Sequence, residues 1–186
     1  PVKQYDASGN VSTVEYNSLG QVVSTTDANG NTTTYKYDKL GRNIETTAPI
    51  EGTKYSVVRQ YYDGNGNVIK TAQKKSTDEW NVTVNTYDNM NRPETTQTGS
   101  GGITQYGYDK VGNMTKMAVG LSAPIDITKA NINGDYELTT YSYDFKNSLV
   151  KATDAMGYEE TYKTDMFGNV TSKTDRNGNV IKTTYN

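Results

Sequence analysis

The chain has 186 residues, a net charge of −2 and no long run of one charge. No basic stretch stands out, so nucleic acid is excluded as an expected partner. Apolar residues make up 33% of the chain, and even with the 17 glycines added this share stays below the ~45–50% typical of globular domains. A thick aliphatic core is therefore not expected.

The chain contains no cysteine and no histidine. Their absence excludes disulfides, thiolate metal sites and cysteine nucleophiles, and it removes the commonest general base. No stretch approaches the ~20 apolar residues that cross a bilayer, so no membrane span is expected. The 16 tyrosines, with abundant threonine, asparagine and glycine, are typical of twisted strands and tight turns. The composition therefore predicts an all-β protein.

A Tyr-Asp phrase recurs along the whole chain. Its first position falls, in chain order, on Tyr16, Tyr37, Tyr62, Tyr87, Tyr108, Tyr143, Thr164 and Tyr185. The spacings are 21, 25, 25, 21, 35, 21 and 21 residues, which indicates a 21-residue unit with extra residues added at one loop. We expect a single repeat domain over residues 1–186, with about eight units. Both ends fall inside a unit, which predicts a piece of a longer chain, from which any export signal would be missing.

Each unit is expected to contain two turns and two strands. The first turn follows the tyrosine, and the second begins ten residues later, as at Asp27, Asp154 and Asp175; the same offset predicts a turn at 6–10. An aspartate that opens a turn accepts hydrogen bonds from the backbone, and a glycine in fourth place tolerates a positive φ. The residues assigned to this structural role are Asp38, Gly41, Asp63, Gly66, Asp109, Gly112, Asp165 and Gly168. Arg42, after the glycine, is expected to face solvent.

The segments between turns alternate as strands do. Tyr35 and Tyr37 fall on one face and Lys36 on the other, and tyrosine pairs with the same spacing follow at 106 and 108 and at 141 and 143. We expect a ladder of tyrosines across neighbouring strands, with each aromatic pair contributing roughly 0.2–1 kcal/mol. The predicted fold is a series of antiparallel β-hairpins in a continuous curled sheet, part of a β-shell or solenoid.

Three insertions lengthen individual units, near residues 48–54, 73–80 and 119–137. All three replace or extend the second turn, so we expect them to emerge from one edge of the sheet. The second carries the only tryptophan, Trp80, in a predicted loop beside Asp78 and Glu79. Trp80 either closes the loop onto the sheet, which is the favoured interpretation, or contacts a partner.

Other chemistry is less favoured than structural roles. The row of turn aspartates could supply oxygen ligands for calcium, but each turn offers a single acid, which favours turn capping. The segment "KANINGDYE" lacks the length and the closing acid of an EF-hand loop. Glu159 and Glu160 are adjacent and point to opposite faces of a strand, so they do not form a glycosidase pair. We expect no catalytic, cofactor-binding or metal-binding residue.

The unit consists of Tyr-Asp, two variable positions, Gly, then Asn or Arg, a short strand, Thr and Asp-x-x-Gly. It resembles the YD repeat of the Rhs (rearrangement hotspot) family, which includes bacterial polymorphic toxins, cocoon-forming subunits of Tc toxin complexes, wall-associated proteins and teneurins. The resemblance implies a long sheet of hairpins that spirals into a hollow shell. In toxins of this kind the shell encloses an effector domain, and in teneurins it presents an adhesion surface.

The chain departs from a complete family member. A closed shell needs more than eight units, and the closing segment that begins with Asp-Pro in bacterial members is not found, so no catalytic aspartate is carried over. No toxin domain is expected within residues 1–186. The expected function is a non-catalytic scaffold around a polypeptide cargo, with the rest of the same chain as partner. The alternative is a cell-surface or filament-forming module that binds glycan, or further copies through exposed strands near Val11 and Thr183.

Overall fold

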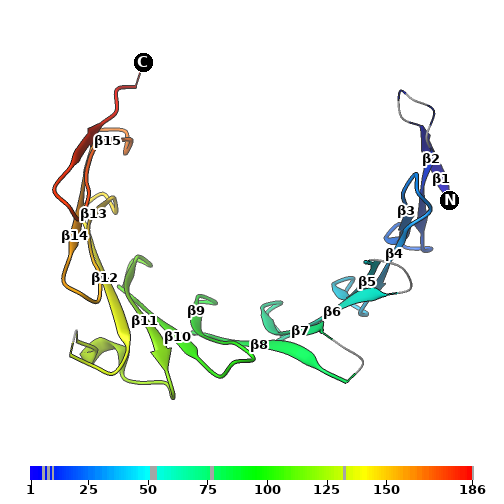
Figure 1. Ribbon diagram of the computed structural model, residues 1–186, viewed down its shortest axis with the longest axis horizontal. Helices are drawn as coiled ribbons and strands as arrows, with labels where there is room; N and C mark the ends of the chain where they lie inside the picture. The colour runs from blue at the N-terminus through cyan, green and yellow to red at the C-terminus, as the bar shows by residue number, and fades with distance from the viewer. Residues whose placement is uncertain are drawn as a thin grey trace. The chain divides into compact units, whose positions relative to one another are not determined.

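The computed structural model of the chain describes residues 1–5, 7, 9, 11–50, 54–75, 78–131 and 133–185. The chain divides into two compact units, Pro1–Asn85 and Thr86–Asn186, and each is described by itself. The described residues form sixteen strands and one short 3-10 helix, so the all-β prediction is confirmed (Figure 1).

The first unit holds eight strands in chain order. They are β1 (Val2–Tyr5), β2 (Val11–Tyr16), β3 (Val22–Thr26), β4 (Thr32–Tyr37), β5 (Asn43–Pro49), β6 (Tyr55–Tyr62), β7 (Val68–Lys74) and β8 (Trp80–Tyr87), the last of which ends just past the unit. Each strand pairs antiparallel with the next one along the chain. Because β1 pairs with β2, the strand at Val11 is covered, and the expectation of an exposed strand there is wrong.

The second unit repeats this arrangement. It contains β9 (Pro93–Gln97), β10 (Ile103–Tyr108), β11 (Met114–Leu121), the 3-10 helix η1 (Ile127–Lys129), β12 (Glu137–Tyr143), β13 (Leu149–Thr153), β14 (Glu159–Thr164), β15 (Val170–Thr174) and β16 (Val180–Lys182). All neighbouring pairs are again antiparallel. The predicted series of tandem hairpins is therefore confirmed within each unit.

The turns keep one backbone geometry even where the phrase changes. The fourth turn residue is a glycine with positive φ at most positions, for example 81° at Gly41 and 88° at Gly168. Asn91 and Asn147 take this place in two units, with φ values of 60° and 62°. Asparagine tolerates the left-handed region better than other non-glycine residues, so these departures in sequence leave the turn intact.

Buried apolar residues are few and mostly lie in one place. In the described part of the first unit, Ala72 is the only buried hydrophobic residue. In the second unit Ile103, Ala118, Leu121 and Leu138 form a cluster, against which part of the 119–137 insertion packs. The absence of a thick core, expected from composition, thus holds for the described residues outside this cluster.

Each insertion joins an odd-numbered strand to the next even-numbered one, at β5–β6, β7–β8 and β11–β12, so within each unit it leaves the sheet at the edge of the second turns, as expected. The third also folds back, because its apolar residues Ile125 and Ile127 pack against a hydrophobic cluster on the face of the sheet. Trp80 is the first residue of β8 and pairs with Lys74, so the loop predicted for it is wrong. Residues 51–53 and 76–77 of the other insertions, and 6, 8 and 10 of the predicted first turn, lie outside the described residues.

The turn that begins at Asp63 allows a matched test of the requirement for a positive φ at the fourth turn residue. Gly66 has φ 92° and Gly64, two residues earlier in the same turn, does not lie in the positive region; both have open space where a Cβ would be built. We expect Gly66→Ala to lower the free energy of unfolding by about 1–2 kcal/mol, since only its backbone becomes strained. Gly64→Ala should be neutral or stabilising, because it restricts the unfolded chain. Urea denaturation of both variants provides the measurement, and equal effects would contradict the assigned geometry.

Candidate functional site

The repeated turns that follow each tyrosine position are the most regular polar feature of the chain. We call them the repeat turns; they begin at residues 17, 38, 63, 88, 109, 144 and 165. In the turn that opens with Asp38, the Gly41 N–H donates to the Asp38 carbonyl at 3.0 Å, and the Asp38 N–H donates to the Arg42 carbonyl at 3.0 Å. These two bonds close the hairpin, as predicted for an aspartate and glycine at this spacing.

The aspartate side chain fastens the turn from inside. One carboxylate oxygen of Asp38 accepts the N–H groups of Leu40 and Arg42, at 2.9 and 3.0 Å, and the other accepts Arg42 Nε at 2.7 Å. Asp63 repeats the pattern with the side-chain amide of Asn67 at 2.9 Å. Asp109 and Asp165 do the same, so the four aspartates assigned to turn capping all fill this role.

These contacts lower the pKa values of Asp38, Asp63 and Asp165. The backbone N–H of Arg42 is the main reason why the pKa of Asp38 lies below its ordinary value of 3.8. For Asp63 and Asp165, the side-chain amides of Asn67 and Asn169 lower the pKa most strongly. Because both oxygens of each carboxylate already accept hydrogen bonds within the turn, the geometry favours capping over cation binding. The described residues contain no cluster of three or more carboxylates that could hold a metal ion.

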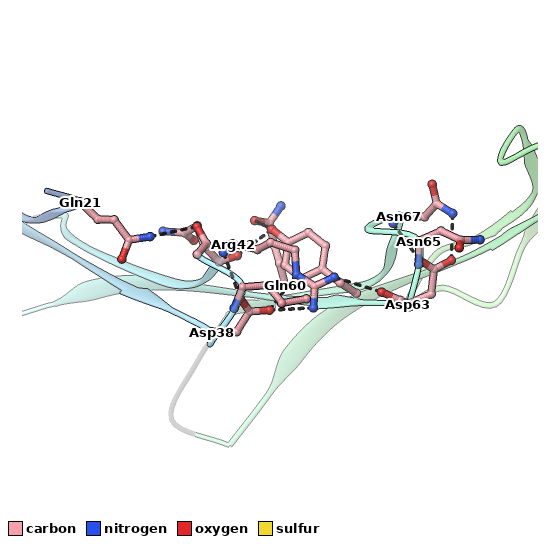
Figure 2. Close-up of polar contacts among 11 residues, drawn as sticks. Gln21, Asp38, Arg42, Gln60, Asp63, Asn65 and Asn67 are labelled. Carbon is pink, nitrogen blue, oxygen red and sulfur yellow. Dashed lines mark hydrogen bonds and ion pairs between the residues drawn. The ribbon is translucent and has the colours of Figure 1, made fainter. Parts of the chain in front are cut away.

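Arg42 connects one repeat turn to the next. Its Nη1 donates to the backbone carbonyl of Asp63 at 3.0 Å, and its guanidinium lies over the Tyr62 ring, 4.6 Å from the centroid. Figure 2 shows Arg42 reaching from Asp38 toward Asp63. The prediction that Arg42 faces solvent is therefore wrong: the fork of the guanidinium has enough donors to bind its own turn and the following one. Only 28% of its side-chain surface is exposed.

In other repeats the residue that follows the fourth turn position makes the same connection, but its side chain differs. Arg92 donates to the Asp109 carbonyl at 3.2 Å and lies 4.4 Å from the centre of the Tyr108 ring. Gln21 Nε2 donates to the Gly41 carbonyl at 3.1 Å, and Asn113 Nδ2 donates to Asn147 Oδ1 at 3.0 Å. We call these contacts the inter-repeat bridges. A signal in the sequence could have revealed them, since a polar side chain with N–H donors follows the fourth turn residue at each of these positions.

The tyrosines form a second set of connections. Tyr37 donates its hydroxyl to the Val22 carbonyl at 2.7 Å, and Tyr143 donates to the Met114 carbonyl at 2.9 Å, in each case to the preceding repeat. The predicted pairing of tyrosines on neighbouring strands is wrong. Tyr35 lies opposite Thr46, because β3 and β5, the strands beside β4, carry no tyrosine. Tyr37 and Tyr143 thus act through their hydroxyls, whereas Tyr62 and Tyr108 each lie beneath an arginine.

Trp80 lies in a group of charged side chains on the first unit. The Arg59 guanidinium lies 4.7 Å from the centre of the Trp80 ring, and Arg59 Nε donates to Glu45 Oε2 at 2.7 Å. Lys36 also pairs with Glu45 at 2.7 Å. The indole is half-buried in this arrangement. A role of Trp80 in contacting a partner stays a prediction.

An exchange at Arg42 tests the inter-repeat bridge. Arg42→Lys keeps the charge but cannot bind Asp38 and Asp63 together while lying flat on Tyr62, so we expect a loss of about 1–2 kcal/mol in unfolding free energy. Lys39→Ala is the matched control, since Lys39 is exposed in the same turn. Chemical denaturation measures both. An Arg42→Lys variant as stable as the control would contradict the bridge.

The capped aspartates also predict the response of stability to acid. The folded-state pKa values of Asp38, Asp63 and Asp165 lie below the unfolded value of 3.8, so the unfolded chain takes up protons first. This stabilisation is complete above the unfolded value and is lost as the pH falls through the lower folded values. Thermal unfolding between about pH 6 and pH 2 should show a falling midpoint below about pH 4. Asp38→Asn should flatten that fall, and an unchanged slope would contradict the assignment.

Comparisons with solved structures were made for the whole chain. The crystal structure of TcdB2-TccC3 has 15% sequence identity and a TM-score of 0.39, and the match covers 94% of this chain and 12% of that chain. A structure of the Photorhabdus luminescens Tc holotoxin pore with a TccC3 mutation gives 15% identity and a TM-score of 0.38, with the same coverage. The chain therefore spans about an eighth of the length of these proteins.

Comparisons by sequence give a narrower result. Curated proteins include none that matches the chain. The family model described as RHS Repeat matches residues 16–49, a segment that contains the repeat turn at Asp38 and the second turn at Asp27. This is the unit whose Tyr-Asp phrase, turn and strand spacing predicted the family. The chain therefore carries an RHS repeat, in the segment from Tyr16 to Pro49.

Proposed function

We propose that the chain is a non-catalytic structural segment of the shell of an exported RHS-repeat protein, which encloses or presents a polypeptide cargo. The observation that carries the proposal is the inter-repeat bridge, in which Arg42 and Arg92 each bind the turn that opens the next repeat. A contact of this kind repeats as long as units are added, so it builds an extended sheet instead of a compact core.

The composition of the faces supports a wall that holds a polypeptide without binding it tightly. In β4 the exposed and half-buried residues alternate, and one face carries threonine and lysine. In β13 all five residues are half-buried, which leaves both faces accessible. The exposed threonine and lysine side chains of β4 offer hydrogen-bonding groups, so this face retains water against a bound chain.

Export is part of the proposal. Among the helices of the described residues, none has the length and apolar character to cross a membrane. The proposed partners are the remainder of the same chain and its cargo, and the proposed location is extracellular or at the cell surface. No cofactor enters this function, because the proposed role is mechanical.

Protection of the cargo tests the proposal in the full-length protein that contains this chain. We expect the cargo to resist limited proteolysis, and we expect the double variant Arg42→Ala with Arg92→Ala to shorten the cargo's protection at least several-fold, since both bridges are lost. Lys39→Ala with Lys110→Ala, at exposed positions of two repeat turns, is the matched control. Cargo that is cleaved equally fast in the unaltered protein and in a separated cargo domain would overturn the proposal.

A second function, self-association through sheet edges, is favoured by one observation. All four residues of β1 and all three of β16 are exposed, and these strands end the strand order of the sheet. Unpaired backbone groups at such strands recruit further strands. In this alternative the chain is a filament-forming module that binds its own copies, or a glycan, at the cell surface.

Light scattering over a concentration series separates the two functions. A filament module grows in one dimension as concentration rises, and Ile181→Lys in β16 should stop this growth because a charge at an edge strand opposes pairing. Lys182→Arg keeps the charge of the same strand and is the control. Size that is independent of concentration would rule out the alternative and leave the scaffold proposal untouched.

A further inference from the structure

Gln105 of β10 is a buried polar side chain that lies opposite Ala118 of the apolar cluster. It is only 5% exposed and lies on the same face of β10 as Ile103. Its amide binds a single residue of the insertion at both ends: Nε2 donates to the Ile125 carbonyl at 3.0 Å, and Oε1 accepts the Ile125 N–H at 2.9 Å. Two bonds to the main chain of one residue are what a neighbouring strand would provide. Gln105 thus recognises the backbone of an extended segment.

A buried apolar cluster, which we call the floor, lies beside this amide. Ile103, Ala118, Leu121 and Leu138 are buried there, and the side chains of Ile125, Ile127, Ala130 and Tyr136 pack against them. Gly107 also leaves room beside the floor for the side chain of Ile127. A Cβ added to Gly107 would lie 3.1 Å from Ile127 Cγ1, so the missing side chain makes the room that Ile127 occupies.

A charged group holds the far end of the segment. Lys116 Nζ donates to the carbonyls of Thr128 and Ala130, at 2.8 and 3.0 Å. These carbonyls lie in and just after η1, where backbone acceptors have no partner within the helix. Gln105 and Lys116 together bind four backbone groups of the insertion, and none of these contacts depends on the identity of its side chains.

We propose that the face of β10, β11 and β12 beneath the insertion is a binding site for an extended polypeptide segment, and that Ile125–Ala130 occupies it in cis. The fitting segment carries two apolar residues separated by one residue, followed by a single helical turn. This inference rests on the proposed scaffold function and deepens it, since it assigns a place where a cargo polypeptide binds once the insertion leaves. An intramolecular segment competes at an effective concentration on the order of millimolar, so the site is closed while the insertion is in place.

Peptide binding to the isolated chain tests the site separately from the cargo-protection experiment. In one variant, residues 122–136 are replaced by the turn sequence of residues 154–157. The probe is a synthetic peptide of residues 122–131. We expect it to bind this variant at least about 100-fold more tightly than it binds the unaltered chain, where the insertion competes. A peptide N-methylated at Ile125 should bind about tenfold more weakly or worse, because it cannot donate to Gln105.

A pair of substitutions in the insertion-free variant identifies the recognising group. Gln105→Leu removes the amide and should weaken the peptide about tenfold or more, whereas Gln97→Leu, at an exposed position of the neighbouring β9, should leave binding unchanged. The proposal is overturned if the folded variant does not bind the peptide at saturating concentration. Equal binding of the N-methylated peptide would also overturn it, because backbone recognition would then be absent.

Hydrogen exchange in the unaltered chain provides a measurement that does not need the insertion-free variant to fold. If the segment is a releasable occupant, the Ile125 amide exchanges by local opening, faster than the amides of the β11–β12 ladder, and Gln105→Leu accelerates it further. Exchange of Ile125 only with global unfolding would show that the segment does not leave the site, and the proposal would fail. A failure of this kind leaves the scaffold function standing, since cargo protection is measured independently.

Discussion

The structure depends on a carboxylate that closes a turn and on the side chain that follows it. Asp38 accepts two backbone N–H groups of its own turn, and Arg42 extends from that turn to the carbonyl of Asp63. The first contact defines a hairpin and the second joins two hairpins. The strands of the described residues bury little apolar surface. These polar contacts therefore stabilise the fold where most domains rely on an apolar core.

The inter-repeat bridge tolerates different residues, because it requires a side chain whose N–H donor reaches the next repeat and does not require a positive charge. Gln21 replaces the guanidinium with an amide and still binds the next turn, and Asn113 bonds to Asn147. Where arginine is present, the adjacent tyrosine ring adds a cation–π contact. Stability of this kind is a sum of nearest-neighbour contacts.

The insertion between β11 and β12 is held mainly by apolar packing and by side chains that bind its backbone. It brings four apolar side chains onto the sheet and completes the one buried cluster of the described residues. Its backbone is bound by Gln105 and Lys116, two strand side chains that face the insertion. An irregular unit in a repeat protein is therefore the place where specific recognition is found, while the regular units supply the frame.

The sequence by itself determined the hairpins, because a turn is a contact between residues four positions apart: Asp38 and Gly41 were readable from spacing alone. It did not reveal that Arg42 binds Asp63, that Tyr35 lies opposite Thr46, or that the insertion covers a face. These contacts join residues 11 to 21 positions apart, so they depend on the register in which strands pair. Only the tertiary structure decided that register, and with it the bridges and the site beneath the insertion.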